Sequence, residues 1–377
     1  MRRARPAPRG RVPAAPARRD RHDARGPRAR AARARHEVGV VVLRGVDYHR
    51  EGDAAGAELL SLDAAALAQG ALLEARALDA AVPREGLLAQ RWDVLHAHDW
   101  YGVLPALAVR ARARTPMVMS AHLPLRYGFT YANHPLPARD KARLEALGFR
   151  QSRRVIAPSG AIATLLEREY DVPREKLRVA HNGVDAERFA PGDVAPAPTV
   201  LSVSRLTEQK GIELLVDAFA EVRARAPGAR LDIAGEGPSR AAIEARVGAL
   251  ALEGSVRLLG HVPHAELPAL YRRAWAFVSA SVYEPFGLTT LEALACGTPA
   301  IVSPLGGGPE IVRDGREGLV RWPHDRGALA GAMIELLSSA ERRAAMGRAA
   351  RERALELSWP ACAARVEACY REAVEEP

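Results

Sequence analysis

The residues whose types and spacing are best suited to chemistry stand at positions 281–304, SVYEPFGLTTLEALACGTPAIVSP. A turn with Pro285 and Gly287 follows an apolar strand, and a helix is expected to begin near Thr289. The free amides of Gly287, Leu288 and Thr289 would then point out of the helix N-terminus, where the helix dipole favours an anion. This stretch therefore predicts a phosphate site.

Two glutamates, Glu284 and Glu292, flank the start of this helix. A carboxylate repels a phosphate, so a glutamate here indicates an acceptor for hydroxyl groups such as those of a ribose or a hexose. The alternative interpretation makes Glu284 a loop charge and Glu292 a first-turn acid that stabilises the helix dipole. For Glu292 taken alone, the sequence does not separate the two interpretations.

A second group of candidate residues stands at positions 202–211, SVSRLTEQKG, where Arg205 and Lys210 directly follow a predicted strand. The arginine offers a planar fork for two phosphate oxygens, and the lysine offers a compact point charge. Gly211 allows the next helix to begin close by. The alternative is a solvated loop, but Lys210 is one of only three lysines in a chain rich in arginine.

A third motif, AGEGP at positions 234–238, predicts a turn between a strand and a helix, with Pro238 in the first turn of the helix. A dinucleotide-binding fingerprint would need glycine at position 240, which is Arg240. A nicotinamide or flavin cofactor is therefore excluded.

Histidines gather in the first half of the chain, in HAHDW at 96–100 and SAH at 120–122, both at predicted strand ends. A histidine at such a place is more often structural than catalytic. His96 and His98, with Asp99, could suggest a metal site, but this interpretation is rejected because two histidines at i and i+2 on a strand end lack a third ligand at the usual spacing.

The elements that must position these motifs are predicted by short, continuous apolar runs. Continuous runs indicate strands that are buried on both faces, and therefore parallel sheets between helices. In such sheets ligands bind beyond the carboxyl ends of the strands. The predicted strands are Val38–Leu43, Val94–Ala97, Met117–Ser120, Val155–Ala157, Val179–Ala180, Thr199–Val203, Leu231–Ala234, Val256–Leu259, Ala276–Ser279, Ala300–Ser303 and Leu319–Arg321.

The chain of 377 residues is long enough for two domains. The proline-rich stretch APGDVAPAP, residues 190–198, is the best candidate linker. We expect a basic arm that is disordered, two domains joined by the linker, and a last amphipathic helix that packs on the first domain. The arm spans residues 1–29, the first domain 30–190, the linker 191–198, the second domain 199–357 and the last helix 358–377.

Composition excludes several classes of protein. Three cysteines without a Cys-x-x-Cys pair argue against a structural zinc site and fit a reducing cytoplasm, and no apolar run is long enough for a membrane helix. The net charge of +9 belongs to the arm, because residues 1–35 hold thirteen arginines and two aspartates, which leaves −2 for residues 36–377. Such an arm can bind nucleic acid or anionic lipid, but a solvated tail is the favoured interpretation.

Together these motifs resemble the retaining nucleotide-sugar glycosyltransferases of family four and their glycogen synthase-like relatives. The resemblance covers about residues 28–377 and rests on SRLTEQKG, AGEGP, HNGVDAERFAP and the block EPFGLTTLEALACGTPAIVSPLGGGPEIVRDGREG. It implies an α/β fold of the GT-B type. In that fold two Rossmann-like domains face each other across a cleft, and the C-terminal helix crosses back to the first domain.

The resemblance also implies roles for individual residues. Arg205 and Lys210 would hold the donor diphosphate, Glu292 the nucleotide ribose, and Glu284 the donor hexose. His122 would line the hexose near its anomeric carbon. The other matched positions are Phe286, Gly287, Leu288 and Thr289 for amide contacts, Glu236, Gly237, His261 and Val262 for the nucleoside pocket, and Asn182 in the hinge-side turn.

One departure from the family concerns the start of the first domain. Members begin with an apolar strand and a Gly-rich loop, and this chain contains neither. We hypothesise that the upstream coding has been lost, misread or shifted in frame, which would leave a gapped first sheet and weak activity.

The leading expectation is a cytoplasmic, metal-independent hexosyltransferase that retains the anomeric configuration and needs no cofactor. Its donor would be a nucleotide-diphosphate sugar, and its acceptor a glycan, a polysaccharide or a small molecule. One alternative is a catalytically impaired sugar-nucleotide-binding protein. The weakest alternative is a binder of nucleic acid or membrane surfaces through the arm, although peripheral membrane contact stays open.

Overall fold

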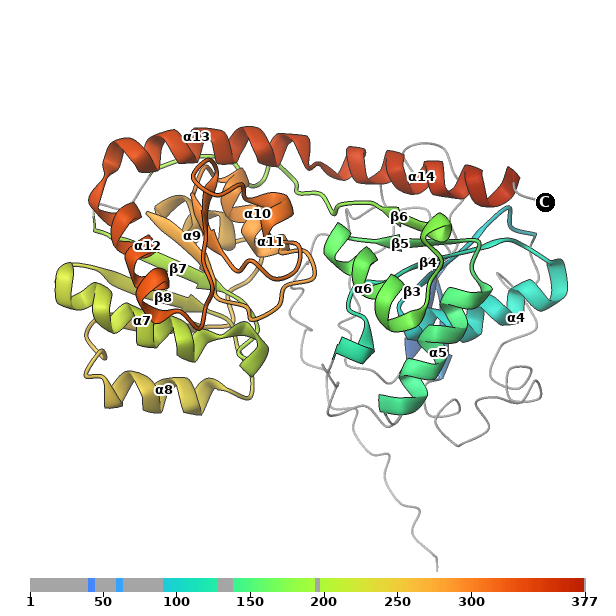
Figure 1. Cartoon of the computed structure of the whole chain (residues 1–377), viewed down its shortest axis with the longest axis horizontal. Coiled ribbons are helices and arrows are strands. Elements are labelled where there is room, and N and C mark those ends of the chain that lie inside the picture. Colours follow the sequence, from blue (N-terminus) through green and yellow to red (C-terminus); the bar gives the residue numbers. More distant parts are fainter. Residues whose placement is uncertain (1–39, 45–58, 64–90, 128–137, 194–196, 376–377) are drawn as a thin grey trace, which may run out of the picture.

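The computed structural model describes residues 40–44, 59–63, 91–127, 138–193 and 197–375. The predicted arm of residues 1–29 lies outside these residues. Within them, the chain forms two α/β units side by side (Figure 1). The α/β fold predicted from the apolar runs is confirmed.

The second unit contains a six-stranded parallel sheet in the order β12-β11-β10-β7-β8-β9. All six of its predicted strands are confirmed to within one or two residues. They are β7 (Thr199–Val203), β8 (Arg230–Ala234), β9 (Val256–Gly260), β10 (Ala276–Ser279), β11 (Ala300–Val302) and β12 (Gly318–Val320). The helices are η5 (Glu208–Lys210), α7 (Ile212–Arg225), α8 (Arg240–Ala249), α9 (Leu267–Arg273), α10 (Leu288–Ala295), α11 (Gly308–Ile311), α12 (Arg326–Ser338) and α13 (Ala340–Glu356).

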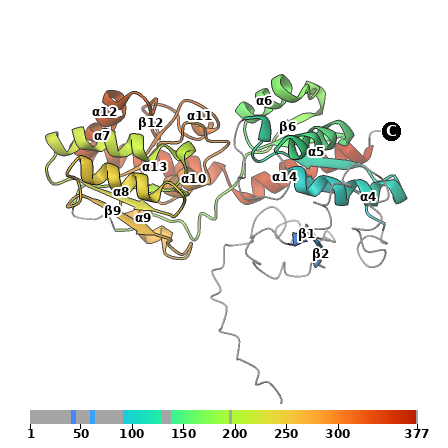
Figure 2. The same cartoon turned by 90° about the horizontal axis from the view of Figure 1, so that it is seen from below.

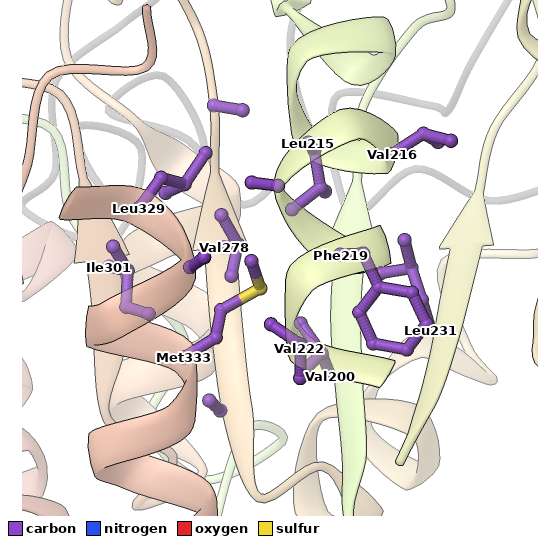
Figure 3. Close-up of a cluster of buried hydrophobic side chains, with 14 of the residues drawn as sticks. Val200, Leu215, Val216, Phe219, Val222, Leu231, Val278, Ile301, Leu329 and Met333 are labelled. Carbon is purple, nitrogen blue, oxygen red and sulfur yellow. The ribbon is translucent and has the colours of Figure 1, made fainter. Parts of the chain in front are cut away.

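Helices cover both faces of this sheet, which explains why its strands are continuously apolar. Figure 3 shows one face, where Val200, Val278 and Ile301 pack against side chains of α7 and α12 such as Phe219 and Met333. The alternate strand residues belong to a second buried cluster with α9, α10 and α13. That cluster includes Leu201, Phe277, Ala300, Tyr271, Leu291, Leu294 and Ala350.

The first unit contains, in its described part, a four-stranded parallel sheet in the order β3-β4-β5-β6 and a separate parallel pair, β1 and β2 (Figure 2). Strand β2 was not among the predicted strands. The strands are β1 (Val40–Arg44), β2 (Leu59–Asp63), β3 (Leu95–His98), β4 (Met117–Ser120), β5 (Arg154–Ala157) and β6 (Leu177–Val179). The helices are η2 (Trp100–Gly102), α4 (Val103–Ala113), η3 (Leu125–Tyr127), α5 (Ala138–Gln151), α6 (Gly160–Tyr170) and η4 (Arg174–Lys176).

The last helix, α14 (Trp359–Glu375), returns to the first unit, as predicted (Figure 1). Its apolar face, which includes Cys362, Val366 and Cys369, packs against Val118 of β4 and Ile156 of β5. The sheet of the first unit is therefore covered by a helix from the far end of the chain.

The two crossings between the units lie side by side. The Val184 amide donates to the Leu357 carbonyl at 3.1 Å, and Val184 forms a parallel bridge with Ser358. Gly183 permits this approach, because a Cβ atom there would lie 2.1 Å from the Trp359 nitrogen. The predicted hinge-side residue, Asn182, directly precedes this contact and is half-buried.

Candidate active site

The order of the second sheet places a topological switch between β7 and β10. From β7 the chain proceeds outward to β8 and β9, whereas β10, β11 and β12 extend from the other side of β7. Ligands of open α/β sheets bind beyond the carboxyl ends of the strands at such a switch. The loops that follow β7 and β10 carry the two strongest motifs of the sequence.

An ion pair joins these two loops. Lys210 Nζ donates to Glu284 Oε2 at 2.7 Å, and Ser281 Oγ donates to the same oxygen at 2.9 Å. The side chains of Lys210 and Glu284 are only 15% and 18% exposed, so water screens their attraction weakly. A cation predicted for the diphosphate and a carboxylate predicted for the hexose thus meet at one point.

The backbone segments that carry Lys210 and Glu284 are in close contact with each other. Gly211 has φ +61°, and a Cβ atom there would lie 2.1 Å from the Ala280 carbonyl oxygen. Gln209 Nε2 donates to the Tyr283 carbonyl at 3.0 Å, and the Val282 amide donates to the Gln209 carbonyl at 2.9 Å. These contacts fix the position of Lys210 relative to the β10 loop.

Helix α10 begins beside Glu284. Gly287, at its N-cap, has φ +105°, which favours glycine. In the part of the chain that the structure describes, no side chain caps this end, so its first amides point toward the loop without a side-chain acceptor. Phe286 and Gly287 are buried, Thr289 is half-buried, and Leu288 is exposed.

The glycine run at positions 306–308, whose role the sequence did not reveal, contacts the backbone of Glu284. The Gly307 amide donates to the Glu284 carbonyl at 2.8 Å, and Gly306 forms a parallel bridge with Glu284. A Cβ atom at Gly306, which has φ +93°, would lie 2.0 Å from the same carbonyl oxygen. Any side chain at position 306 would therefore clash with the loop that carries Glu284.

The AGEGP turn lies directly beside the loop that carries Arg205. The Leu206 amide donates to the Glu236 carbonyl at 2.8 Å, and the Gly235 amide donates to the Gly260 carbonyl at 2.7 Å. At Gly237, which has φ +158°, a Cβ atom would lie 2.3 Å from the Leu206 carbonyl oxygen. The turn is therefore fitted between the loops that follow β7 and β9.

These loops bring further predicted site residues to the same edge of the sheet. Gly260, the last residue of β9, is followed directly by His261 and Val262. The Glu236, His261 and Arg205 side chains are all exposed. No hydrogen bond or ion pair of the Arg205 guanidinium is found among the described residues.

Glu292 sits one turn into α10, as predicted, and it has protein partners that the sequence did not reveal. His264 Nε2 lies 2.9 Å from Glu292 Oε1, and the Tyr271 hydroxyl donates to Oε2 at 2.8 Å. Burial first, and then the neighbouring Glu292 charge, raise the pKa of Tyr271 well above its usual range. A carboxylate has lone pairs for further donors, so its predicted contact with a ribose stays a prediction.

His122, the candidate residue of the first unit, follows β4. The buried Asp99 carboxylate accepts from the His122 amide at 2.7 Å. Burial raises the pKa of Asp99, although the amides of His122 and Leu123 and the hydroxyl of Tyr101 counteract it. His122 Nε2 lies 2.9 Å from His98 Nδ1, and the described contacts of His122 stay within the first unit.

Several contacts join the two units next to this site. Glu310, in α11, accepts from the amides of Gly160 and Ala161 at 2.9 and 3.0 Å, at the N-terminus of α6. His181 Nε2 lies 2.8 Å from the same carboxylate and its ring stacks on Phe286. Ser159 Oγ donates to the Pro285 carbonyl at 2.7 Å, so both units hold the turn before α10.

Neither a metal-binding group nor a membrane-spanning helix is found among the residues that the structure describes. Nowhere among them do three His, Cys, Asp or Glu side chains form a group that could hold a metal ion. None of the helices found there is long and apolar enough to cross a membrane.

Comparison with known proteins identifies the two halves of the chain separately. Residues 28–188 match the family described as Glycosyltransferase Family 4, and residues 184–353 match Glycosyl transferases group 1. The two matches overlap at residues 184–188, where the chain crosses between the units.

Individual proteins match across both halves. The chain is 33% identical to a D-inositol 3-phosphate glycosyltransferase of Segniliparus rotundus over 319 residues, which cover 79% of this chain and 70% of that protein. It is 35% identical to a glycogen synthase of Mycobacterium tuberculosis over 269 residues, which cover 70% of this chain. The chain spans only 64% of the length of that glycogen synthase.

A solved structure agrees with the fold. The sucrose-phosphate synthase of Thermosynechococcus elongatus superimposes with a TM-score of 0.74 and 26% sequence identity, over 92% of this chain and 91% of that one. The six-stranded and four-stranded parallel sheets, the returning last helix and these matches lead to one conclusion. The chain belongs to the GT-B glycosyltransferases of the family 4 and group 1 type.

Proposed function

We propose that the protein transfers a hexose from a nucleotide-diphosphate sugar to an acceptor hydroxyl, with retention of the anomeric configuration and without a metal ion. The observation that carries the proposal is the pairing of Lys210 with Glu284 at the switch between β7 and β10. It joins a cation suited to phosphate oxygens and a carboxylate suited to sugar hydroxyls.

The groups around the pair account for departure of the nucleotide diphosphate. As the bond between the anomeric carbon and the phosphate oxygen breaks, the electron pair remains on the phosphate. Lys210 and the first amides of α10, which the fold holds in place, would meet this charge together with the exposed Arg205. Because two cations and a helix N-terminus supply the counter-charge, a divalent ion is not needed for charge balance.

Glu284 would act on the sugar. Its carboxylate accepts from the Ser281 hydroxyl, while the Gly307 amide holds the main-chain carbonyl of Glu284, and the carboxylate can also accept hydrogen bonds from hexose hydroxyls. The acceptor oxygen would bond to the anomeric carbon on the face from which the phosphate leaves, and its proton would pass to the departing phosphate oxygen. His122, from the first unit, would line the same centre. Same-face attack gives retention.

The test is release of nucleotide diphosphate from a panel of UDP-, ADP- and GDP-sugars, with the product anomer read by NMR. We expect turnover of one donor class with a retained configuration, and loss of turnover in Lys210→Ala. Lys176→Ala is the matched control, because the Lys176 side chain donates to the Arg150 carbonyl in the first unit, away from this site.

Two results would contradict the proposal. One is binding of nucleotide-sugars without turnover of any of them, which corresponds to a catalytically impaired binding protein. The other is an inverted product. Equal losses in the Lys176 and Lys210 variants would show that removal of any lysine, rather than this site, explains the effect.

A further inference from the structure

Three imidazole rings stand in a row at the carboxyl ends of β3 and β4. The rings of His96 and His98 stack with centroids 4.2 Å apart, and those of His98 and His122 stack with centroids 5.2 Å apart and planes within 3°. His98 Nδ1 and His122 Nε2 are also hydrogen-bonded at 2.9 Å. The His122 ring is therefore in contact with His98, which in turn stacks on His96.

The far end of this row is held by the last helix. The hydroxyl of Tyr370, in α14, lies 2.6 Å from His96 Nδ1, although 274 residues separate the two in sequence. His96 Nε2 lies 2.8 Å from Ser120 Oγ, in the last residue of β4. Both ring nitrogens of His96 thus have a partner on a different element.

Helix α14 is anchored independently of this hydroxyl. Glu372 accepts from Arg154 Nε at 2.6 Å and from Arg178 Nε at 2.9 Å, on β5 and β6. Cys369, in the same helix, is buried against the sheet of the first unit. Removal of the Tyr370 hydroxyl would therefore leave the helix docked.

The Tyr370 hydroxyl determines which ring nitrogen of His96 carries the proton. A neutral imidazole donates from one nitrogen and accepts at the other, so a phenol that donates to His96 Nδ1 leaves the proton on Nε2, directed at Ser120. A charged His96 would place a cation against the stacked His98 ring. The hydrogen bond between His98 and His122 likewise holds a single proton.

We propose that Tyr370 is a positioning residue for the transfer reaction: it fixes the proton of His96 and, through the stacked His98, the orientation of His122. This inference rests on the proposed function, in which His122 lines the reacting centre. It assigns the C-terminal helix a part in the reaction besides covering the sheet.

The experiment compares Tyr370→Phe with two controls on the same helix. Glu372→Gln weakens the anchoring of α14 without touching the histidines, and Val374→Ala changes an exposed side chain. For each full-length variant, kcat, the donor KM, the Kd of nucleotide diphosphate and the melting temperature are measured. Histidine ring-nitrogen shifts are recorded by NMR after 15N-histidine labelling, with signals assigned through single histidine substitutions.

In Tyr370→Phe we expect kcat to fall about tenfold, the change that corresponds to loss of one orienting hydrogen bond. The donor KM and the Kd of nucleotide diphosphate should stay within about twofold, because remote binding groups in the second unit are unchanged. The ring-nitrogen signals of both His96 and His122 should shift. Glu372→Gln should lower the melting temperature and keep kcat and those signals.

Three outcomes would overturn the proposal. They are a wild-type kcat in Tyr370→Phe, a shift at His96 with none at His122, and a Glu372→Gln variant that reproduces the loss of kcat. If the wild-type protein turns over no nucleotide-sugar, the proposed function fails. The NMR signals then still decide whether Tyr370 sets the state of His122.

Discussion

Lys210 and Glu284 are 74 residues apart in sequence and 2.7 Å apart in space, and their ion pair spans the two neighbouring strands at which the sheet reverses its order. The two side chains hold each other in place before any ligand binds. The ammonium group has three N–H donors, so it can hold Glu284 and a phosphate oxygen together. The pair is thus arranged in advance for a ligand that carries phosphate and hydroxyl groups.

Arg205→Ala should lower kcat about a hundredfold, which is about 3 kcal/mol of transition-state stabilisation, because its contact strengthens as charge develops on the leaving phosphate. Its side chain is exposed, so the melting temperature should not change. Steady-state kinetics and thermal denaturation check this. Arg225→Ala, another exposed arginine at the end of α7, is the matched control, and wild-type turnover in Arg205→Ala would remove this residue from the site.

Substitution of Glu284 and of Glu292 should have different effects on kcat and on the donor KM. Glu292→Gln should raise the donor KM more than it lowers kcat, because contacts with the remote ribose change little along the reaction, whereas Glu284→Gln should lower kcat more than it raises KM. Calorimetry adds a second measurement. Nucleotide diphosphate, which lacks the hexose, should bind more weakly to the Glu292 variant and unchanged to the Glu284 variant. The reverse pattern would show that the roles of the two residues are exchanged.

Activity should survive dialysis against excess EDTA. Lys210, Arg205 and the N-terminus of α10 supply the positive charge that a metal ion supplies in other enzymes. Initial rates before and after chelation, with Mg²⁺ or Mn²⁺ added back, make the comparison. Loss of activity that either ion restores would mean that this counter-charge is insufficient.

A buried carboxylate in the first unit should make stability depend on pH. Burial raises the pKa of Glu145 to about 7, although Tyr170 and the Leu125 amide donate to the carboxylate. The unfolded chain ionises at lower pH, so the stabilising contribution is complete below about pH 4.5 and is lost as the pH rises to about 7. Relative to Glu145→Gln, the wild-type free energy of unfolding should fall by about 3 kcal/mol over this window.

Urea unfolding of both proteins across that pH range measures the difference. Glu244→Gln is the control, because Glu244 is an exposed partner of Arg240 on α8 and should show no such dependence. A difference in the free energy of unfolding between wild type and Glu145→Gln that does not change with pH would disprove this role of Glu145.

The contact of Glu310 with α6 should respond to pH in the opposite direction. Burial alone would raise the pKa of Glu310, but the hydrogen bonds from His181 and from the Gly160 and Ala161 amides outweigh it and hold the pKa below its usual range. Its stabilising contribution is therefore present above the ordinary glutamate value and is lost as the pH falls through the lowered one. Glu310→Gln should lower the free energy of unfolding by about 1–3 kcal/mol at neutral pH, and the difference from wild type should disappear in acid. Thermal denaturation of both proteins checks this, and a gap that widens in acid would contradict it.

Strands and helix starts could be predicted from the sequence wherever the residues that cause them lie within one short segment. Strands such as Ala276–Ser279 were predictable because burial on both faces demands a continuous apolar run. The start of α10 was predictable because the turn residues Pro285 and Gly287 precede it.

The partners of the site residues were not predictable in this way. No spacing rule connects Lys210 with Glu284, Glu310 with α6, or Tyr370 with His96, because each contact exists only after distant strands and helices have packed. For Glu292 the sequence left two interpretations open, and the bonds from His264 and Tyr271 became visible only in the fold.

The return of α14 to the first sheet has a consequence for synthesis on the ribosome. The strands of the second unit come from one uninterrupted stretch of chain, so that unit can close its core as soon as the stretch has emerged. The first unit emerges earlier, yet Val118 and Ile156 lack the packing that Cys362, Val366 and Cys369 provide until these residues have been made. The half of the protein that is translated first is therefore the half that finishes folding last.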